Sequence, residues 1–175
     1  IDARNVAFVS SDNPSLTMNS LTVRADAVGD DPGINLNSDF VDATLTGPYS
    51  WKSLVPAVND IMSQAFPVFF KPSPMLAAGR ENRFELHTEV KYSEELNRFL
   101  NLPVNLIYPA KIDASLNSSS RSMSLAVDIP YLQQKDKLIE QTSLRFDIDS
   151  IQSVARLHAS TTMPTANGGN TINID

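Results

Sequence analysis

Apolar and polar residues alternate along most of the chain, a pattern typical of β-strands with one buried face. The clearest example is VNLIYPAKIDASLN, residues 104–117, where seven apolar residues recur at every second position. The same alternation predicts strands at residues 19–28, 34–45, 83–92, 121–132, 137–149, 153–163 and 171–174. Within residues 34–45 the apolar positions change from even to odd numbers, so we expect a bulge near Asp39 and Phe40.

The alternation in the C-terminal half also predicts how the strands pair, because paired residues of antiparallel strands point to the same face. From residue 104 onward the apolar positions are even, odd, even, odd and even in successive strands. Two-residue turns preserve one shared apolar face throughout, giving a five-strand meander with long strands. The predicted turns are Ser119–Ser120, Lys135–Asp136, Ile151–Gln152 and Gly168–Gly169.

The first of these turns pairs Leu116 with Met123, Ile112 with Val127 and Tyr108 with Tyr131. It also places Pro109 opposite Pro130. Because neither proline can donate a hydrogen bond to a sheet, we expect an interruption that bends the sheet at this level.

Two segments have helical spacing instead. Apolar residues recur every three or four positions in residues 51–66, which predicts an amphipathic helix capped by Ser50 or Ser53. Its expected packing residues are Trp51, Leu54, Val55, Val58, Ile61, Met62 and Phe66. Residues 93–103 predict a short helix with Ser93 as its cap.

These elements predict a mainly β fold: a long, curled antiparallel sheet of the half-pipe type, with one amphipathic and one short helix. We expect a single domain over residues 1–175, with sub-units 1–66 and 84–175 joined by the irregular, proline-rich residues 67–83. The alternating last residues and the absence of an initiator Met suggest a piece of a longer protein.

Composition narrows the functional classes. The chain has 175 residues, 42% of them hydrophobic, no cysteine and a net charge of −6, which argues against nucleic acid as a partner. His87 and His158, the two histidines, lie on the polar faces of their strands without the clustered acidic residues of a metal site. No nucleophile motif or phosphate loop is present, so we expect no enzyme activity, metal or cofactor.

The shared apolar face has two interpretations. It is either a core covered by the helix at residues 51–66 or a surface that meets a partner or an apolar ligand. A helix of about 15 residues is roughly 23 Å long and 10 Å wide. Five or more strands, up to roughly 45 Å long and 4.8 Å apart, present a larger area than that.

Residues 34–67, INLNSDFVDATLTGPYSWKSLVPAVNDIMSQAFP, and residues 97–149 resemble segments of the TamB-like, AsmA-like proteins of Gram-negative envelopes, especially those of Bacteroides-type bacteria. The resemblance implies a long periplasmic protein anchored in the inner membrane and reaching the outer membrane. Its middle would be a half-pipe of β-strands with an apolar interior.

That resemblance implies a hydrophobic groove for phospholipid transport between the membranes, and support of outer-membrane assembly beside an Omp85-type barrel. Further partners would be an acyl-chain ligand and neighbouring β-segments of the same chain. The alternative is a closed-core spacer, or a module that binds partners by β-strand addition. The residues expected to line the groove are Leu106, Tyr108, Ile112, Leu116, Met123, Leu125, Val127, Ile129, Leu144, Phe146, Ile148 and Leu157.

Overall fold

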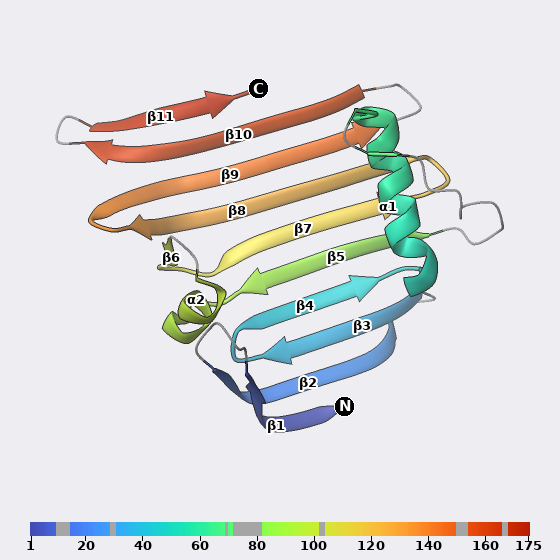
Figure 1. Ribbon diagram of the computed structural model, residues 1–175, viewed down its shortest axis with the longest axis horizontal. Helices are drawn as coiled ribbons and strands as arrows, with labels where there is room; N and C mark the ends of the chain where they lie inside the picture. Colours follow the sequence, from blue (N-terminus) through green and yellow to red (C-terminus); the bar gives the residue numbers. More distant parts are fainter. Residues whose placement is uncertain are drawn as a thin grey trace.

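The computed structural model describes residues 1–9, 15–28, 31–68, 70–71, 82–101, 104–149, 154–165 and 168–175. It confirms the predicted fold class: eleven antiparallel strands form one open, curled sheet, accompanied by two helices (Figure 1). Strands from residues 1–66 and from residues 84–175 belong to this same sheet. Most of the segment 67–83 lies outside the described residues.

Spatial order in the sheet follows the sequence from β1 to β11, except that the short β6 pairs with β8 (Figure 1). The strands are β1 (Asp2–Phe8), β2 (Leu16–Val28), β3 (Asp31–Ser38), β4 (Val41–Thr46), β5 (Arg83–Val90), β6 (Asn105–Leu106), β7 (Ala110–Asn117), β8 (Ser122–Gln134), β9 (Lys137–Asp149), β10 (Val154–Thr165) and β11 (Gly168–Ile174).

The register predicted for the C-terminal half is confirmed between β7, β8 and β9. Leu116 pairs with Met123, and Ile112 pairs with Val127. Gln134 pairs with Lys137, so the two residues between them form the predicted turn. The turn predicted at Ile151–Gln152 lies outside the described residues. Both β8 and β9 are 13 residues long, as the extended alternation indicated.

The last predicted turn is wrong. Gly168 pairs with Thr165, so Gly168 and Gly169 are part of β11, and Ile174 pairs with Ala159 rather than with Met163. The pairing shifts by four residues along β10, and an even shift leaves every side chain on its expected face. The apolar alternation therefore could not distinguish the two turn positions.

The bulge expected near Asp39 and Phe40 is instead a turn that joins β3 to β4. The Ser38 hydroxyl accepts hydrogen bonds from the backbone N–H groups of Phe40 and Val41, at 3.3 and 3.0 Å. A serine that holds a tight turn in this way is a common alternative to a continuous strand. A bulge and a tight turn both shift the apolar positions from even to odd numbers, so the pattern could not distinguish them, and a bulge was predicted where the chain forms a turn.

The sheet is interrupted where the prolines predicted an interruption. The chain leaves the sheet at residues 107–109, between β6 and β7. One residue more separates Leu106 from Lys111 than separates their partners, Leu132 and Asp128. The neighbouring β9–β10 ladder also shifts register, near Gln141, which has a positive φ of 50°. Irregular backbone therefore crosses several strands at one level.

Helix α1 (Trp51–Ala65) lies across one end of the strands (Figure 1). Ala57 and Ile61 of α1 form a buried cluster with Leu116 of β7 and Ile148 of β9. Val58, Met62 and Phe66 pack around this cluster, as the helical spacing predicted. The side chains of Trp51, Leu54 and Val55 lie outside the described residues. Ser50 is the N-cap, one of the two predicted caps, and Pro56 lies inside the helix.

Helix α2 (Glu94–Leu100) lies at the opposite end of the strands (Figure 1). It begins as predicted, because the Ser93 hydroxyl accepts a hydrogen bond from the N–H of Leu96 at 3.1 Å. Leu96 and Phe99 pack against a second buried cluster, formed by Leu16, Met18 and Phe40. Neither α1 nor α2, the helices among the described residues, is long and apolar enough to cross a membrane.

Candidate functional site

One apolar face continues across the sheet, because the register aligns apolar positions in rows that run perpendicular to the strands. We distinguish two rows. The covered row consists of Phe84, Leu116, Met123 and Ile148. The uncovered row consists of Val23, Leu36, Ala43, Thr88, Ile112, Val127, Leu144 and Ala159. On β7 the two rows are four residues apart, or about 13 Å.

The covered row lies beneath α1. Leu116 and Ile148 are only 1% and 2% exposed. Met123 packs against the same cluster, as does Phe146 in the row beside it, whose ring stacks on Phe66 with 6.1 Å between the centroids. These four residues were predicted to line a groove. In this structure they form the floor beneath α1, and Leu116 and Ile148 are buried by the helix.

The uncovered row is different. Its members are half-buried, and in the part of the chain that the structure describes none of them belongs to either buried cluster. The row spans seven strand spacings, or roughly 34 Å, whereas α1, with 15 residues, is only about 23 Å long. The predicted lining residues Ile112, Val127 and Leu144 lie in this row.

The other predicted lining residues lie outside the uncovered row. Leu125 and Ile129 lie on the same face of β8 and are half-buried. Leu157 on β10 is 48% exposed. Tyr108 is 54% exposed, and its ring lies 5.2 Å from that of Tyr131 between centroids.

Leu106 does not continue the row of Ile112. Its partner Leu132 is even-numbered, whereas the residues of β8 on the apolar face are odd-numbered, so Leu132 and Leu106 point to the other face. The extra residue near Pro109 causes this change of face. Leu106 instead lines a pocket at the end of the strands.

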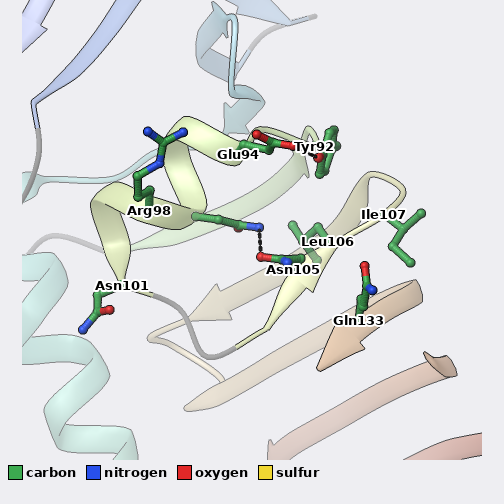
Figure 2. Close-up of a pocket in the computed structure, with 9 residues that line it drawn as sticks. Tyr92, Glu94, Arg98, Asn101, Asn105, Leu106, Ile107 and Gln133 are labelled. Atoms are coloured by element: carbon green, nitrogen blue, oxygen red, sulfur yellow. Dashed lines mark hydrogen bonds between the residues drawn. The ribbon is translucent and has the colours of Figure 1, made fainter. Parts of the chain in front are cut away.

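That pocket has a volume of about 760 Å³ and lies between α2 and the segment that contains β6 (Figure 2). Charged and phenolic groups come from Tyr92, Glu94 and Arg98. Side-chain amides come from Asn97, Asn101, Asn105 and Gln133, and apolar surface comes from Leu106 and Ile107. The Asn97 amide donates to the Asn105 carbonyl oxygen at 3.0 Å, which ties α2 to β6 across the pocket. The volume is in the range of small-molecule sites.

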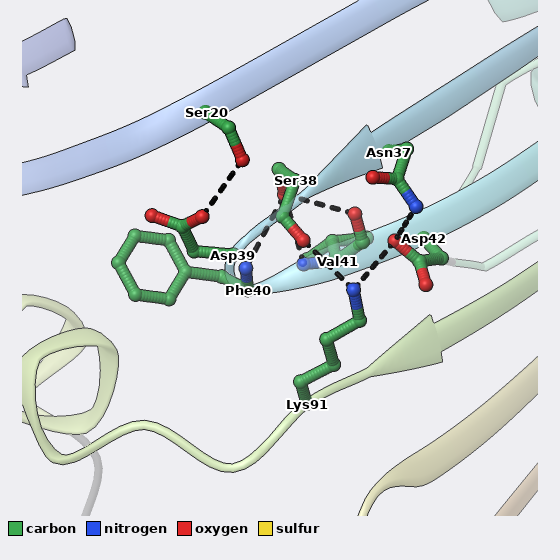
Figure 3. Close-up of polar contacts among 8 residues, drawn as sticks. All are labelled: Ser20, Asn37, Ser38, Asp39, Phe40, Val41, Asp42 and Lys91. Atoms are coloured by element: carbon green, nitrogen blue, oxygen red, sulfur yellow. Dashed lines mark hydrogen bonds and ion pairs between the residues drawn. The ribbon is translucent and has the colours of Figure 1, made fainter. Parts of the chain in front are cut away.

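Polar contacts around the β3–β4 turn fix the end of β5, from which the chain leads into α2 (Figure 3). The Lys91 ammonium donates to the Ser38 carbonyl and to the Asp42 carboxylate, each at 2.8 Å. These bonds fix the chain at the end of β5, immediately before Tyr92 enters the pocket. Phe40, in the same turn, belongs to the buried cluster against which Leu96 and Phe99 pack.

The opposite face of the sheet carries cross-strand polar pairs. His87 Nδ1 lies 2.6 Å from Asp113 Oδ1, and Arg145 makes two hydrogen bonds to Asp128 at 2.8 and 2.9 Å. His158 contacts Asp175. Within the described part of the chain, no group of three or more His, Asp or Glu side chains is arranged to hold a metal ion.

The sequence pattern did not predict the pocket, because most of the residues that line it come from separate elements: α2, β6 and the end of β8. One signal was present: Asn97, Asn101 and Asn105 recur at intervals of four. That spacing can place amides on one side of a helix. The chain leaves the helix at Asn101, however, and β6 returns Asn105 to the same pocket.

Comparisons of the chain with protein-family models, with curated proteins and with solved structures found no match.

Proposed function

We propose that this chain is a non-enzymatic segment of an envelope-spanning protein and that its apolar face forms part of a hydrophobic groove for phospholipid chains. The observation that carries the proposal is the uncovered row. It presents side chains across eight strands, apolar on every strand except β5, where the member is Thr88. Among the described residues, α1 packs on the covered row beyond it. The resemblance to TamB-like proteins supports the same function.

The energetics of such a surface suit a carrier. Burying an acyl CH₂ group contributes about 0.8 kcal/mol. A chain of about 16 carbons lying on an open face loses roughly half of its contact with water, which yields on the order of 6 kcal/mol. That corresponds to dissociation constants of tens of micromolar at best. Binding of this strength holds a lipid and still lets it leave, which conduction along a row of sites requires.

The cellular setting of the proposal rests on the resemblance. In that setting the segment lies in the periplasm, within a protein anchored in the inner membrane. Neighbouring β-segments of the same protein continue the groove toward the outer membrane. There an Omp85-type barrel is the partner, and outer-membrane assembly depends on the lipid supply.

Site-specific photo-crosslinking tests the groove. A benzophenone amino acid replaces Val127 in the uncovered row or, as the control, its neighbour Ala126 on the opposite face of β8. The purified chain is irradiated with phosphatidylethanolamine–phosphatidylglycerol vesicles and analysed by mass spectrometry. We expect lipid adducts at position 127 and few at position 126. Equal yields, or none at position 127, would contradict the proposal.

The second candidate function is β-strand addition, which the open edges of the sheet favour. β11 forms one edge, and its Ile172 and Ile174 are exposed. An edge strand of this kind offers unpaired backbone groups to another strand. Replacing Ile112 and Val127 together with Asp distinguishes the functions: lipid adducts disappear while the fold persists if the row is a groove. A closed core would instead unfold.

A further inference from the structure

The pocket beside α2 has the charges of a zwitterion receptor. Glu94 and Arg98 are four residues apart on α2, and both line the pocket (Figure 2). Residues at this spacing lie on the same side of a helix. Among the described residues, neither side chain forms an ion pair with the other or with any third group. One exposed anion and one exposed cation therefore border the same pocket, and within the described part of the chain neither has an ion-pair partner.

The remaining lining suits a small polar head joined to an apolar body. The Tyr92 hydroxyl donates to Glu94 Oε1 at 3.2 Å. Loss of contact with water, together with the bond to Glu94 and its negative charge, raises the pKa of Tyr92 above its ordinary value. Side-chain amides both donate and accept hydrogen bonds, so they suit phosphate and ester oxygens. Leu106 and Ile107 supply apolar surface beside these polar groups.

The pocket also adjoins the face assigned to acyl chains. Tyr92 lies two residues beyond the end of β5, and that strand carries Thr88, a member of the uncovered row. α1 lies at the other end of the strands (Figure 1). A lipid with its tails on the uncovered row can therefore place its head at α2, whereas α1 covers the sheet at the opposite end.

We propose that this pocket binds the zwitterionic head of the transported lipid, with Arg98 on the phosphate and Glu94 on the ammonium group. This inference rests on the proposed function. It predicts a preference for phosphatidylethanolamine over phosphatidylglycerol, because the latter lacks the ammonium group that Glu94 binds. A charge-assisted hydrogen bond contributes about 1.5–3 kcal/mol, so the preference should be roughly tenfold or more.

The test uses short-chain, water-soluble phosphatidylethanolamine and phosphatidylglycerol with identical acyl chains, and isothermal titration calorimetry on the purified chain. Glu94→Gln should reduce the preference to less than about twofold by weakening phosphatidylethanolamine alone. Arg98→Gln should weaken both lipids about equally, because both carry the phosphate. Glu95→Gln is the control on the same helix. Glu95 does not line this pocket but borders a second, smaller one with Arg98, so its variant should keep the parent chain's preference between the two lipids.

Equal affinity of the parent chain for the two lipids would overturn the inference, and so would equal effects of Glu94→Gln and Glu95→Gln. If that happens while the double replacement of Ile112 and Val127 with Asp abolishes binding, the acyl groove stands and only the headgroup site fails. If neither lipid binds the parent chain, the proposed function fails as well. Glycerophosphoethanolamine, the head without tails, is the last probe: binding as tight as that of the lipid would show a soluble ligand and overturn the lipid assignment.

Discussion

Two truncations on β7 decide whether the uncovered row is exposed surface or closed core. Leu116 and Ile112 lie on the same face of the same strand, four residues apart. Leu116 is 1% exposed beneath α1, whereas Ile112 is half-buried and lies outside both buried clusters. Replacing either residue with Ala removes the same number of carbon atoms. The two variants therefore differ mainly in what covers the site.

The expected losses follow from burial. Truncating a fully buried leucine leaves a cavity and costs about 2–5 kcal/mol, so we expect about 3 kcal/mol for Leu116→Ala. Ile112→Ala opens no closed cavity and loses only part of the transfer free energy, about 1 kcal/mol. In a chain of this size each 1 kcal/mol lowers the Tm by about 2–4 °C. The Tm should then fall by about 6–12 °C for Leu116→Ala and about 2–4 °C for Ile112→Ala.

Urea denaturation followed by circular dichroism measures both free energies of unfolding. Lys111→Ala, an exposed position on the other face of β7, serves as the control. It should change the free energy of unfolding by less than about 0.5 kcal/mol. Equal losses for Leu116→Ala and Ile112→Ala would show that Ile112 is as enclosed as Leu116 and would refute the open groove.

Three further predictions concern the scaffold. Hydrogen bonds from the Asn19 N–H, the larger effect, and from the Ser20 hydroxyl lower the pKa of Asp39 below 3.8. Asp39→Asn should therefore lower the Tm at pH 7. In a Tm series from pH 7 to pH 2.5, the difference between the variant and the parent chain should disappear as the pH falls through the lowered pKa. Gly47→Ala should destabilise the fold by more than about 1 kcal/mol in urea denaturation, because φ is +111° and a Cβ would lie 2.4 Å from a backbone oxygen. Arg145→Met should cost less than about 1 kcal/mol, and less still at high salt, because the Arg145 and Asp128 side chains are 43% and 44% exposed, so water and salt weaken their ion pair. A larger, salt-independent loss would contradict this.

The period-two alternation was sufficient to predict the faces and much of the pairing. Leu116 pairs with Met123, and Ile112 with Val127, as the shared apolar face and a turn near Ser119–Ser120 predicted. The same argument fails for shifts by an even number of residues, which is why the turn before β11 was misplaced. It also cannot separate a bulge from a tight turn, as the β3–β4 turn shows.

The site was less predictable because it depends on where elements far apart in sequence meet. Helical spacing indicated that Ile61 and Met62 pack on something, but not that they cover Leu116 and leave Ile112 open. One extra residue near Pro109 moved Leu106 off the apolar face and into the pocket. Local patterns carry no information about such tertiary placement, in which a single inserted residue reverses the face of a strand.

The position of α1 explains how this sheet can be stable and still leave apolar side chains open. Ala57 and Ile61 bury Leu116 and Ile148 at one end of the strands, and Leu96 and Phe99 complete a second cluster at the other. The sheet is thus anchored at both ends of its strands, while the uncovered row between them contributes less to stability. Substitutions in that row can therefore remove lipid binding without unfolding the chain. If substitutions in the row unfolded the chain, the row would have to be part of the core. The free energies of unfolding of Ile112→Ala and Leu116→Ala distinguish these two cases.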